Sequence, residues 1–182
     1  RSPSHVSRTH PELVHKYGEL LWLDPAERAV QDHSAAVILD VVRRYDVDGV
    51  HLDDYFYPYP EKDAAGKWME FPDAKTWRAY EKKGGKLSRE DWRRDNVNRF
   101  MHRLGESIHA EKPWVKFGIS PFGIWRPGNP PSVKGLDACE RLFADSRMWL
   151  TNGWMDYCAP QLYWSIDSPQ QSYSALLKWW SE

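Results

Sequence analysis

The chain has 182 residues and almost no net charge, with 25 lysine and arginine residues against 26 aspartate and glutamate residues. This length allows a single domain with a buried core, and the charge balance argues against a nucleic-acid partner, which requires a basic surface. The residues after Arg1 lack the apolar region of a signal peptide, and no apolar stretch is long enough for a transmembrane segment. The two cysteines, Cys139 and Cys158, are too few for a disulfide framework or a structural zinc site, so we expect buried free thiols.

Helical and strand-like patterns alternate along the chain. In order, they predict a weak strand at 20–23, a helix at 25–45, a strand at 47–52, a short helix at 73–83, a long helix at 88–111, a strand at 115–119, a helix at 136–150, a strand at 155–159 and a helix at 169–180. Asp24 is the expected N-cap of the first helix, with Pro25 at its first position. Ser88 with Asp91 resembles a capping box for the long helix.

This alternation is typical of an α/β fold with parallel strands and crossover helices. A closed (β/α)8 TIM barrel has about 250 residues, so the few strands predicted here correspond to about half of a barrel. We therefore predict that residues 1–182 form a single domain that is part of a TIM barrel, a fragment of the whole. Its first and third strong strands are expected to leave open sheet edges.

Side-chain alternation along the strand at 47–52 separates two faces. Val50 and Leu52 are expected to pack on the helices. His51 and Asp53 are expected to point into the barrel, with Asp53 at the carboxyl-terminal mouth, where barrel enzymes carry their catalytic groups. Asp54 is expected to point away from Asp53. For His51, a hydrogen bond to substrate or to Asp53 is a better prediction than metal ligation.

The same alternation places polar groups of the other two strong strands at the mouth. Ser120 follows the second strand, and Gln161 and Tyr163 follow the third, so we expect them to converge with Asp53 in one concave site. Such a site suits a ligand rich in hydroxyl groups. It offers no cluster of histidines and carboxylates for a metal, and the chain has no glycine-rich phosphate loop, so no cofactor is predicted.

The chain is rich in aromatic residues, with 11 tryptophans, 9 tyrosines and 6 phenylalanines. Core packing accounts for many of them. Rings beside prolines and turns instead fit a groove in which flat faces stack on sugar rings. The candidates for this substrate groove are Tyr55, Tyr57, Trp125, Tyr163 and Trp164.

Four segments, at 45–58, 91–98, 117–125 and 159–164, resemble the motifs of the bacterial glycosyl hydrolase-like family 10, and 22–25 also fits. The resemblance follows these motifs in order over nearly the whole chain. It implies a TIM barrel of which this chain covers about strands 4 to 6 with their helices. It also implies a secreted, periplasmic or lipid-anchored cell-envelope protein. The implied substrate is peptidoglycan glycan, including strands stripped of their stem peptides.

Glycosidic cleavage generally uses two carboxyl groups. We interpret Asp53 as the nucleophile or base. Asp54, Asp95 and Asp167 are candidates for the acid inside the chain, and an acid from the rest of the barrel, outside this chain, is an equal alternative. Asp54 and Asp95 also have structural interpretations, as a loop-holding carboxylate and as a favourable charge at a helix N-terminus.

Arg94 is expected to line the groove or to pair with Asp53 or Asp54. Two functions other than a glycoside hydrolase stay open. One is a carbohydrate-binding barrel without catalysis, and the other is an unrelated barrel enzyme that acts on a small polar substrate.

Overall fold

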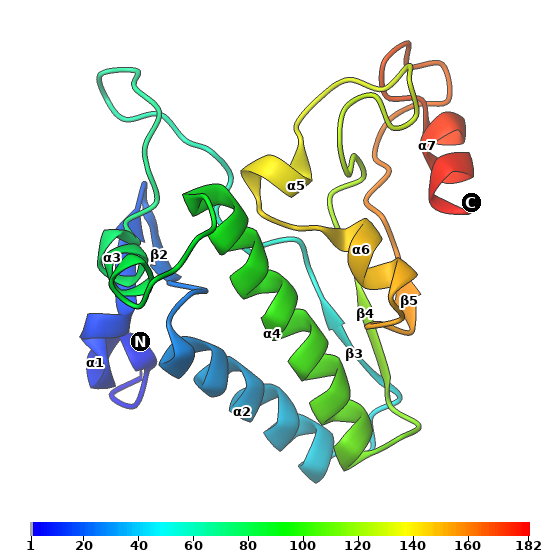
Figure 1. Cartoon of the computed structure of the whole chain (residues 1–182). Helices are drawn as coiled ribbons and strands as arrows, with labels where there is room; N and C mark the ends of the chain where they lie inside the picture. Colours follow the sequence, from blue (N-terminus) through cyan, green and yellow to red (C-terminus); the bar gives the residue numbers. More distant parts are fainter. Residues whose placement is uncertain (1) are drawn as a thin grey trace.

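The computed structural model describes residues 2–182, which form a mixed α/β fold with its two ends on opposite sides (Figure 1). The elements in chain order are α1 (Val6–Thr9), the 3-10 turn η1 (Pro11–Leu13), β1 (Val14–Tyr17), β2 (Leu20–Leu23), α2 (Arg28–Arg44), β3 (Gly49–Leu52), α3 (Ala74–Lys82), α4 (Arg89–Glu111), β4 (Lys116–Ile119), α5 (Ala138–Arg141), α6 (Ser146–Thr151), β5 (Tyr157–Cys158) and α7 (Tyr173–Trp180).

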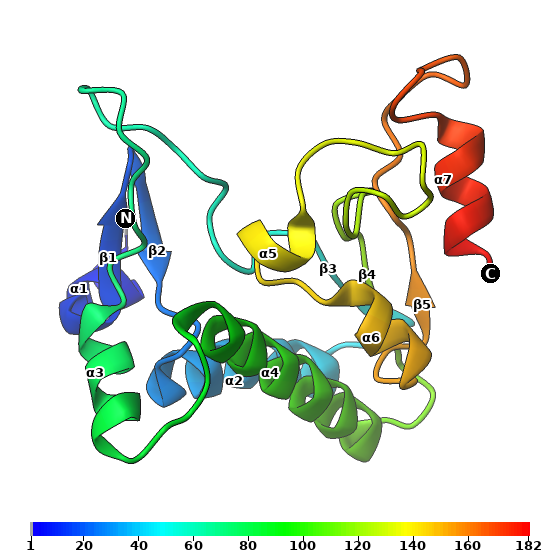
Figure 2. The ribbon, with the colours of Figure 1, turned by 45° about the horizontal axis from the view of Figure 1, so that its top comes forward.

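The three strong strands form one parallel sheet in the order β3-β4-β5. Helix α2 leads into β3, α4 leads from β3 to β4, and the two helices lie side by side against one face of the sheet (Figure 2). The predicted α/β class and the parallel neighbours are therefore confirmed. Parallel strands with helices on one face are consistent with part of an α/β barrel.

Alternation along the strands divides buried from exposed side chains as the sequence predicts. Val50 and Leu52 of β3 are half-buried and pack against the core, and Phe117 and Ile119 of β4 are fully buried there. His51, on the opposite face, is exposed. The helix side of the sheet is thus the hydrophobic core, and the other face is open for polar chemistry.

Helix α4 is the central element of this core. Its N-terminus is capped as expected, because Ser88 Oγ accepts from Asp91 N over 3.1 Å and donates to the Asp91 carboxylate over 2.8 Å. Gly105, in the C-terminal half of α4, faces the carbonyl oxygen of Trp154, which a Cβ would approach to 2.5 Å. The helix therefore reaches the turn before β5 at backbone contact. Among residues 2–182, no helix combines the length and the apolar character that a bilayer crossing needs.

The weak strand at 20–23 has a different role from the one expected. Leu20–Leu23 pairs antiparallel with β1, and this hairpin is a separate two-stranded sheet. Asp24 is not the N-cap of α2, which is Glu27. Its buried carboxylate instead accepts from Ala26 N over 2.9 Å and from the Thr76 hydroxyl over 2.7 Å, and so holds the start of α3.

The prediction of a single helix at 136–150 is wrong. Two short helices, α5 and α6, replace it, with Asp137 and Asp145 as their N-caps. Between them Phe143 has φ of 55°, a left-handed conformation that ends a helix. The apolar spacing is real, because Leu142 and Trp149 are fully buried, but a turn separates the two segments. Cys139 is buried and Cys158 half-buried, and both are free thiols.

The long segment between β3 and α4 is anchored at two points before α3. Near its start, Glu61 N donates to the Tyr17 hydroxyl of the hairpin over 3.1 Å. Just before α3, the buried Asp73 accepts from Arg93 Nε over 2.6 Å and from Arg93 Nη2 over 3.0 Å, and it also binds Arg89. Because both arginines belong to α4, the segment is fixed to the central helix.

Candidate active site

Asp53 follows the last residue of β3 and is exposed at the carboxyl end of the sheet. Its Oδ1 accepts from Gln161 Nε2 over 2.7 Å and from Asp54 N over 3.0 Å. The same Gln161 amide donates to Ser120 O over 2.9 Å. One glutamine therefore joins the ends of all three strands and holds a carboxylate that solvent can reach.

Ser120 and His51 complete this polar cluster on the open face. His51 Nε2 lies 2.6 Å from Ser120 Oγ, and its Nδ1 lies 2.8 Å from the Tyr157 hydroxyl. The expected convergence of Asp53, Ser120 and Gln161 is confirmed. His51 belongs to the cluster through Ser120 rather than through Asp53. Tyr163 is 84% exposed, and in residues 2–182 no hydrogen bond or ring contact joins it to the cluster.

Asp54 points away from Asp53, as the alternation predicts. It is 3% exposed and accepts a short hydrogen bond from the Tyr59 hydroxyl. Burial raises the pKa of Asp54, the hydrogen bond from Tyr59 opposes this shift, and the charge of Asp53 adds to it. Asp54 therefore anchors the loop after β3, and Asp53 is the carboxylate of the pair that a ligand can reach.

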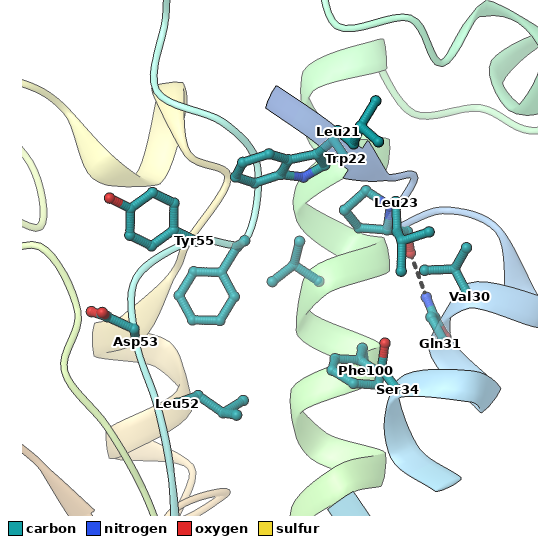
Figure 3. Close-up of a pocket in the computed structure, with 13 residues that line it drawn as sticks. Leu21, Trp22, Leu23, Val30, Gln31, Ser34, Leu52, Asp53, Tyr55 and Phe100 are labelled. Carbon is teal, nitrogen blue, oxygen red and sulfur yellow. Dashed lines mark hydrogen bonds between the residues drawn. The ribbon is translucent and has the colours of Figure 1, made fainter. Parts of the chain in front are cut away.

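A pocket of about 360 Å³ lies between β3, β2 and the helices α2 and α4. Figure 3 shows that Leu52 and Asp53 leave the chain on opposite sides, with Leu52 directed toward the helices. Trp22, Val30 and Phe100 make the lining largely apolar. Asp53 and Tyr55 stand at its border. The pocket therefore belongs to the helix side of β3, and the polar cluster lies on the other side.

The predicted aromatic residues fall into two groups. Tyr55 is 60% exposed, and its ring lies 6.1 Å from Trp22 and 5.8 Å from Tyr59, measured between centroids. Tyr55 therefore stays accessible at the border of the same pocket as Asp53. Tyr57 is only 1% exposed and packs edge-on against Phe71 and Phe143, so its expected place in an open groove is wrong. A ring next to prolines can equally lie in the core.

Trp125 and Trp164 lie in the loops after β4 and β5. Trp125 stacks on Trp179 of α7 at 5.8 Å and donates to Asp145 Oδ1 over 2.9 Å. Trp164 packs edge-on against Phe122 at 5.7 Å. Both rings are half-buried, and these contacts fix the two loops to each other and to α7. Each ring can therefore meet a ligand only through the part of it that stays exposed.

Arg94 is committed to another part of the structure. It donates to Cys139 O over 3.1 Å and pairs with Asp91 at 2.6 Å and Glu140 at 3.0 Å. The expected pairing with Asp53 or Asp54 is therefore wrong, and Arg94 instead joins α4 to α5.

Two further carboxylates, Asp95 and Asp167, are candidates for the acid. Asp95 pairs with Arg99 at 3.0 Å on α4, and Asp167 is exposed in the loop that follows Trp164. Within residues 2–182 no group of three or more histidine, cysteine or carboxylate side chains is arranged to hold a metal ion. The cluster around Asp53 thus consists of one carboxylate, an imidazole, hydroxyls and an amide.

Tyr157 is the residue of the cluster that was not among the candidates. Alternation along the third strand places it on the same face as Gln161, and this was the available signal. Its distance to His51 could not follow from its own strand, because another strand lies between them.

The chain is similar to known proteins over nearly its whole length. The family model described as Glycosyl hydrolase-like 10 matches residues 1–182. The chain belongs to this family. The chain is also similar to glycosyl hydrolase YngK of Bacillus subtilis (strain 168), at 43% identity over 99% of the chain and 35% of YngK.

A second similar protein is glycosyl hydrolase DigH of Escherichia coli (strain K12), at 35% identity over 100% of the chain and 40% of DigH. DigH of Shigella flexneri matches to the same extent. The chain therefore spans 35% to 40% of the length of these curated relatives of the family. The Asp53 cluster lies within the part that the family shares.

Proposed function

We propose that this member of the glycosyl hydrolase-like 10 family belongs to a glycoside hydrolase. Asp53 is the central carboxylate of its active site. The observation that carries the proposal is that Asp53 is exposed at the carboxyl end of β3 and held by Gln161 at 2.7 Å. Catalytic groups of barrel enzymes lie at this end of the strands. A fixed carboxylate there can stabilise the positive charge that develops on a sugar ring during cleavage.

In this mechanism Asp53 acts as the nucleophile or base. The second carboxyl group must donate a proton to the leaving oxygen. Asp54 is buried against Tyr59, and Asp95 is half-buried and pairs with Arg99, so Asp167 is the most exposed of the three candidates inside the chain. Without a partner acid the same cluster would bind sugars and not cleave them, which is the alternative function that the experiment below separates.

The proposed substrate is a bacterial polysaccharide, and specifically the glycan strand of peptidoglycan. Ser120 and Gln161 offer uncharged hydrogen-bonding groups that suit hydroxyl and amide groups of sugars, and His51 holds Ser120. Tyr55 presents an exposed ring beside Asp53 for stacking on a sugar face. A substrate of this kind places the protein outside the cytoplasm, as a secreted, periplasmic or lipid-anchored cell-envelope protein.

The test is Asp53→Asn in the full-length protein. Asn keeps the shape and the hydrogen bond but removes the charge that acts mainly in the transition state, so we expect release of soluble fragments from purified peptidoglycan to be abolished. Binding to the same material in a pull-down is expected to remain. Both intact and peptide-stripped glycan are used as substrates.

The matched control is Asp48→Asn, which changes an exposed aspartate at the opposite end of the same strand. It is expected to leave release unchanged. Release by Asp53→Asn at the wild-type rate would remove Asp53 from the mechanism. Binding without release by the unmutated protein would favour the carbohydrate-binding alternative.

A further inference from the structure

Three residues of the open face occupy one row across the parallel sheet. The strand register pairs His51 with Gly118, and Gly118 with Tyr157. Neighbouring strands are about 4.8 Å apart, so side chains two strands apart are usually separated by another side chain. Here the His51 and Tyr157 rings stack at 5.5 Å between centroids, and their polar atoms are 2.8 Å apart.

Gly118 explains how the tyrosine reaches the histidine. A Cβ at this position would lie 2.2 Å from the Tyr157 ring, so any side chain there would occupy the space of the ring. Tyr157 therefore crosses over the central strand on the bare backbone of Gly118. The contact depends on the glycine in the middle of the row, which supports a built arrangement rather than a chance meeting of two exposed rings.

The second nitrogen of His51 continues the chain of hydrogen bonds. His51 Nε2 lies 2.6 Å from Ser120 Oγ, one row closer to the mouth. A neutral imidazole has one donor and one acceptor nitrogen, and the group bound to one nitrogen selects the tautomer. If the phenol donates to Nδ1, the proton of His51 is on Nε2 and is donated to Ser120 Oγ. The hydroxyl hydrogen of Ser120 is then directed away from His51.

We propose that Tyr157 is a positioning residue that sets the Nε2–H tautomer of His51 and thereby makes Ser120 a hydrogen-bond donor to the ligand beside Asp53. The inference rests on the proposed function, since the ligand is the glycan of that site. It extends the proposed function by assigning which group donates and which accepts in the hydrogen bonds that join Tyr157, His51 and Ser120. The complementary group on the sugar is an acceptor without a proton of its own, and the carbonyl oxygen of an acetamido group has this chemistry.

The surroundings of Ser120 argue against its use as a nucleophile. An acyl-transfer step would require donors for the oxyanion that forms. The Ser120 N–H already donates to Leu52 O over 2.9 Å, and Pro121 has no N–H. The Gln161 amide donates to Asp53 and to Ser120 O. These donors are occupied, so the hydroxyl fits the role of a ligand contact.

The first test reads the tautomer directly and needs no substrate. The full-length protein is labelled with 15N-histidine, and the His51 signals are assigned by their loss in His51→Gln. We expect an unprotonated Nδ1 and a protonated Nε2 in the wild type, and a mixture of tautomers in Tyr157→Phe, which keeps the ring but removes the hydroxyl. Tyr45→Phe, at a tyrosine 60% exposed beyond α2, is the matched control and is expected to change nothing. A protonated Nδ1 in the wild type, or an unchanged tautomer in Tyr157→Phe, would overturn the proposal.

The second test asks whether Tyr157 affects ligand binding through Ser120 or independently of it. It is a double-mutant cycle on the affinity for peptide-stripped glycan strands. Loss of one oriented hydrogen bond weakens binding by about fivefold, so we expect this for Tyr157→Phe and a loss of at least that size for Ser120→Ala. Tyr157→Phe added to Ser120→Ala is expected to cause no further loss, because no hydroxyl is left to orient. If the losses of affinity of the two single variants multiply in the double variant, the proposed action of Tyr157 through Ser120 is overturned. A wild-type protein that does not bind this glycan would contradict the proposed function while the tautomer test still decides the role of Tyr157.

Discussion

Gln161 donates from its side-chain amide to Oδ1 of Asp53 over 2.7 Å, although the two residues are 108 positions apart in the chain. The other contact of the same amide, to Ser120 O, prevents it from rotating away. Asp53 is therefore held in place by the loop after β5 rather than by its own strand alone.

The first prediction concerns this contact. Gln161→Leu removes both hydrogen bonds and keeps a similar volume, so Asp53 loses the group that orients it. We expect kcat for glycan cleavage to fall by about tenfold with a smaller change in KM, because orientation of the carboxylate matters most in the transition state. Steady-state kinetics of the full-length protein measure both constants. Gln170→Leu, at an exposed glutamine of the following loop, is the control. An unchanged kcat in Gln161→Leu would show that Asp53 needs no such support.

The second prediction concerns the pH dependence of stability at Asp54. Burial raises its pKa, so the folded protein holds the proton more tightly than the unfolded chain does. Ionised Asp54 consequently costs stability at neutral pH, and this cost disappears as the pH falls through the ordinary range of a carboxyl group. Asn carries no charge and can still accept from Tyr59, so Asp54→Asn is expected to gain stability relative to wild type at neutral pH.

Urea unfolding of both proteins at about pH 7 and about pH 3.5 checks this expectation. The gain in the free energy of unfolding is expected to be larger at the higher pH. A difference that grows toward acid pH would contradict the assigned direction of the pKa shift.

The third prediction concerns the buried ion pair of Asp73 and Arg93, whose shortest contact is 2.6 Å. Asp73→Asn leaves the arginine charge without its buried partner, so we expect a loss of about 3–5 kcal/mol in the free energy of unfolding. Glu70→Gln is a matched control, because Glu70 contacts the same guanidinium at 3.5 Å but its side chain is 81% exposed. Its expected cost is below about 1 kcal/mol. Equal costs for the two variants would contradict the role given to burial.

The sequence was sufficient for the features that depend on local period. Alternation along one strand separated Leu52 from Asp53, and the spacing of Ser88 and Asp91 located the start of α4. The meeting of Asp53 with Gln161 also followed, because parallel strands end at the same edge of a sheet.

The features that escaped prediction depend on contacts between distant segments. The apolar spacing at 136–150 is the same for one helix as for two short helices, and only the conformation of Phe143 distinguishes them. Tyrosine has an apolar ring and a polar hydroxyl, so its type alone does not decide whether it is buried. The burial of Tyr57 follows from its packing against Phe71 and Phe143, which are distant in sequence. The reach of Tyr157 to His51 required the register of three strands with a glycine in the middle.

The anchoring of the long segment between β3 and α4 has a consequence for the thermodynamics of binding. Its residue Glu61 is tied to the hairpin at Tyr17 and its residue Asp73 to α4 at Arg93, so this side of the site is already ordered before a ligand arrives. Ordering a flexible loop consumes part of the interaction energy of a ligand. A glycan that binds to this preorganised segment does not have to offset the entropy lost when a loop becomes ordered. The free energy of its contacts with Tyr55 and the polar cluster therefore contributes more fully to affinity.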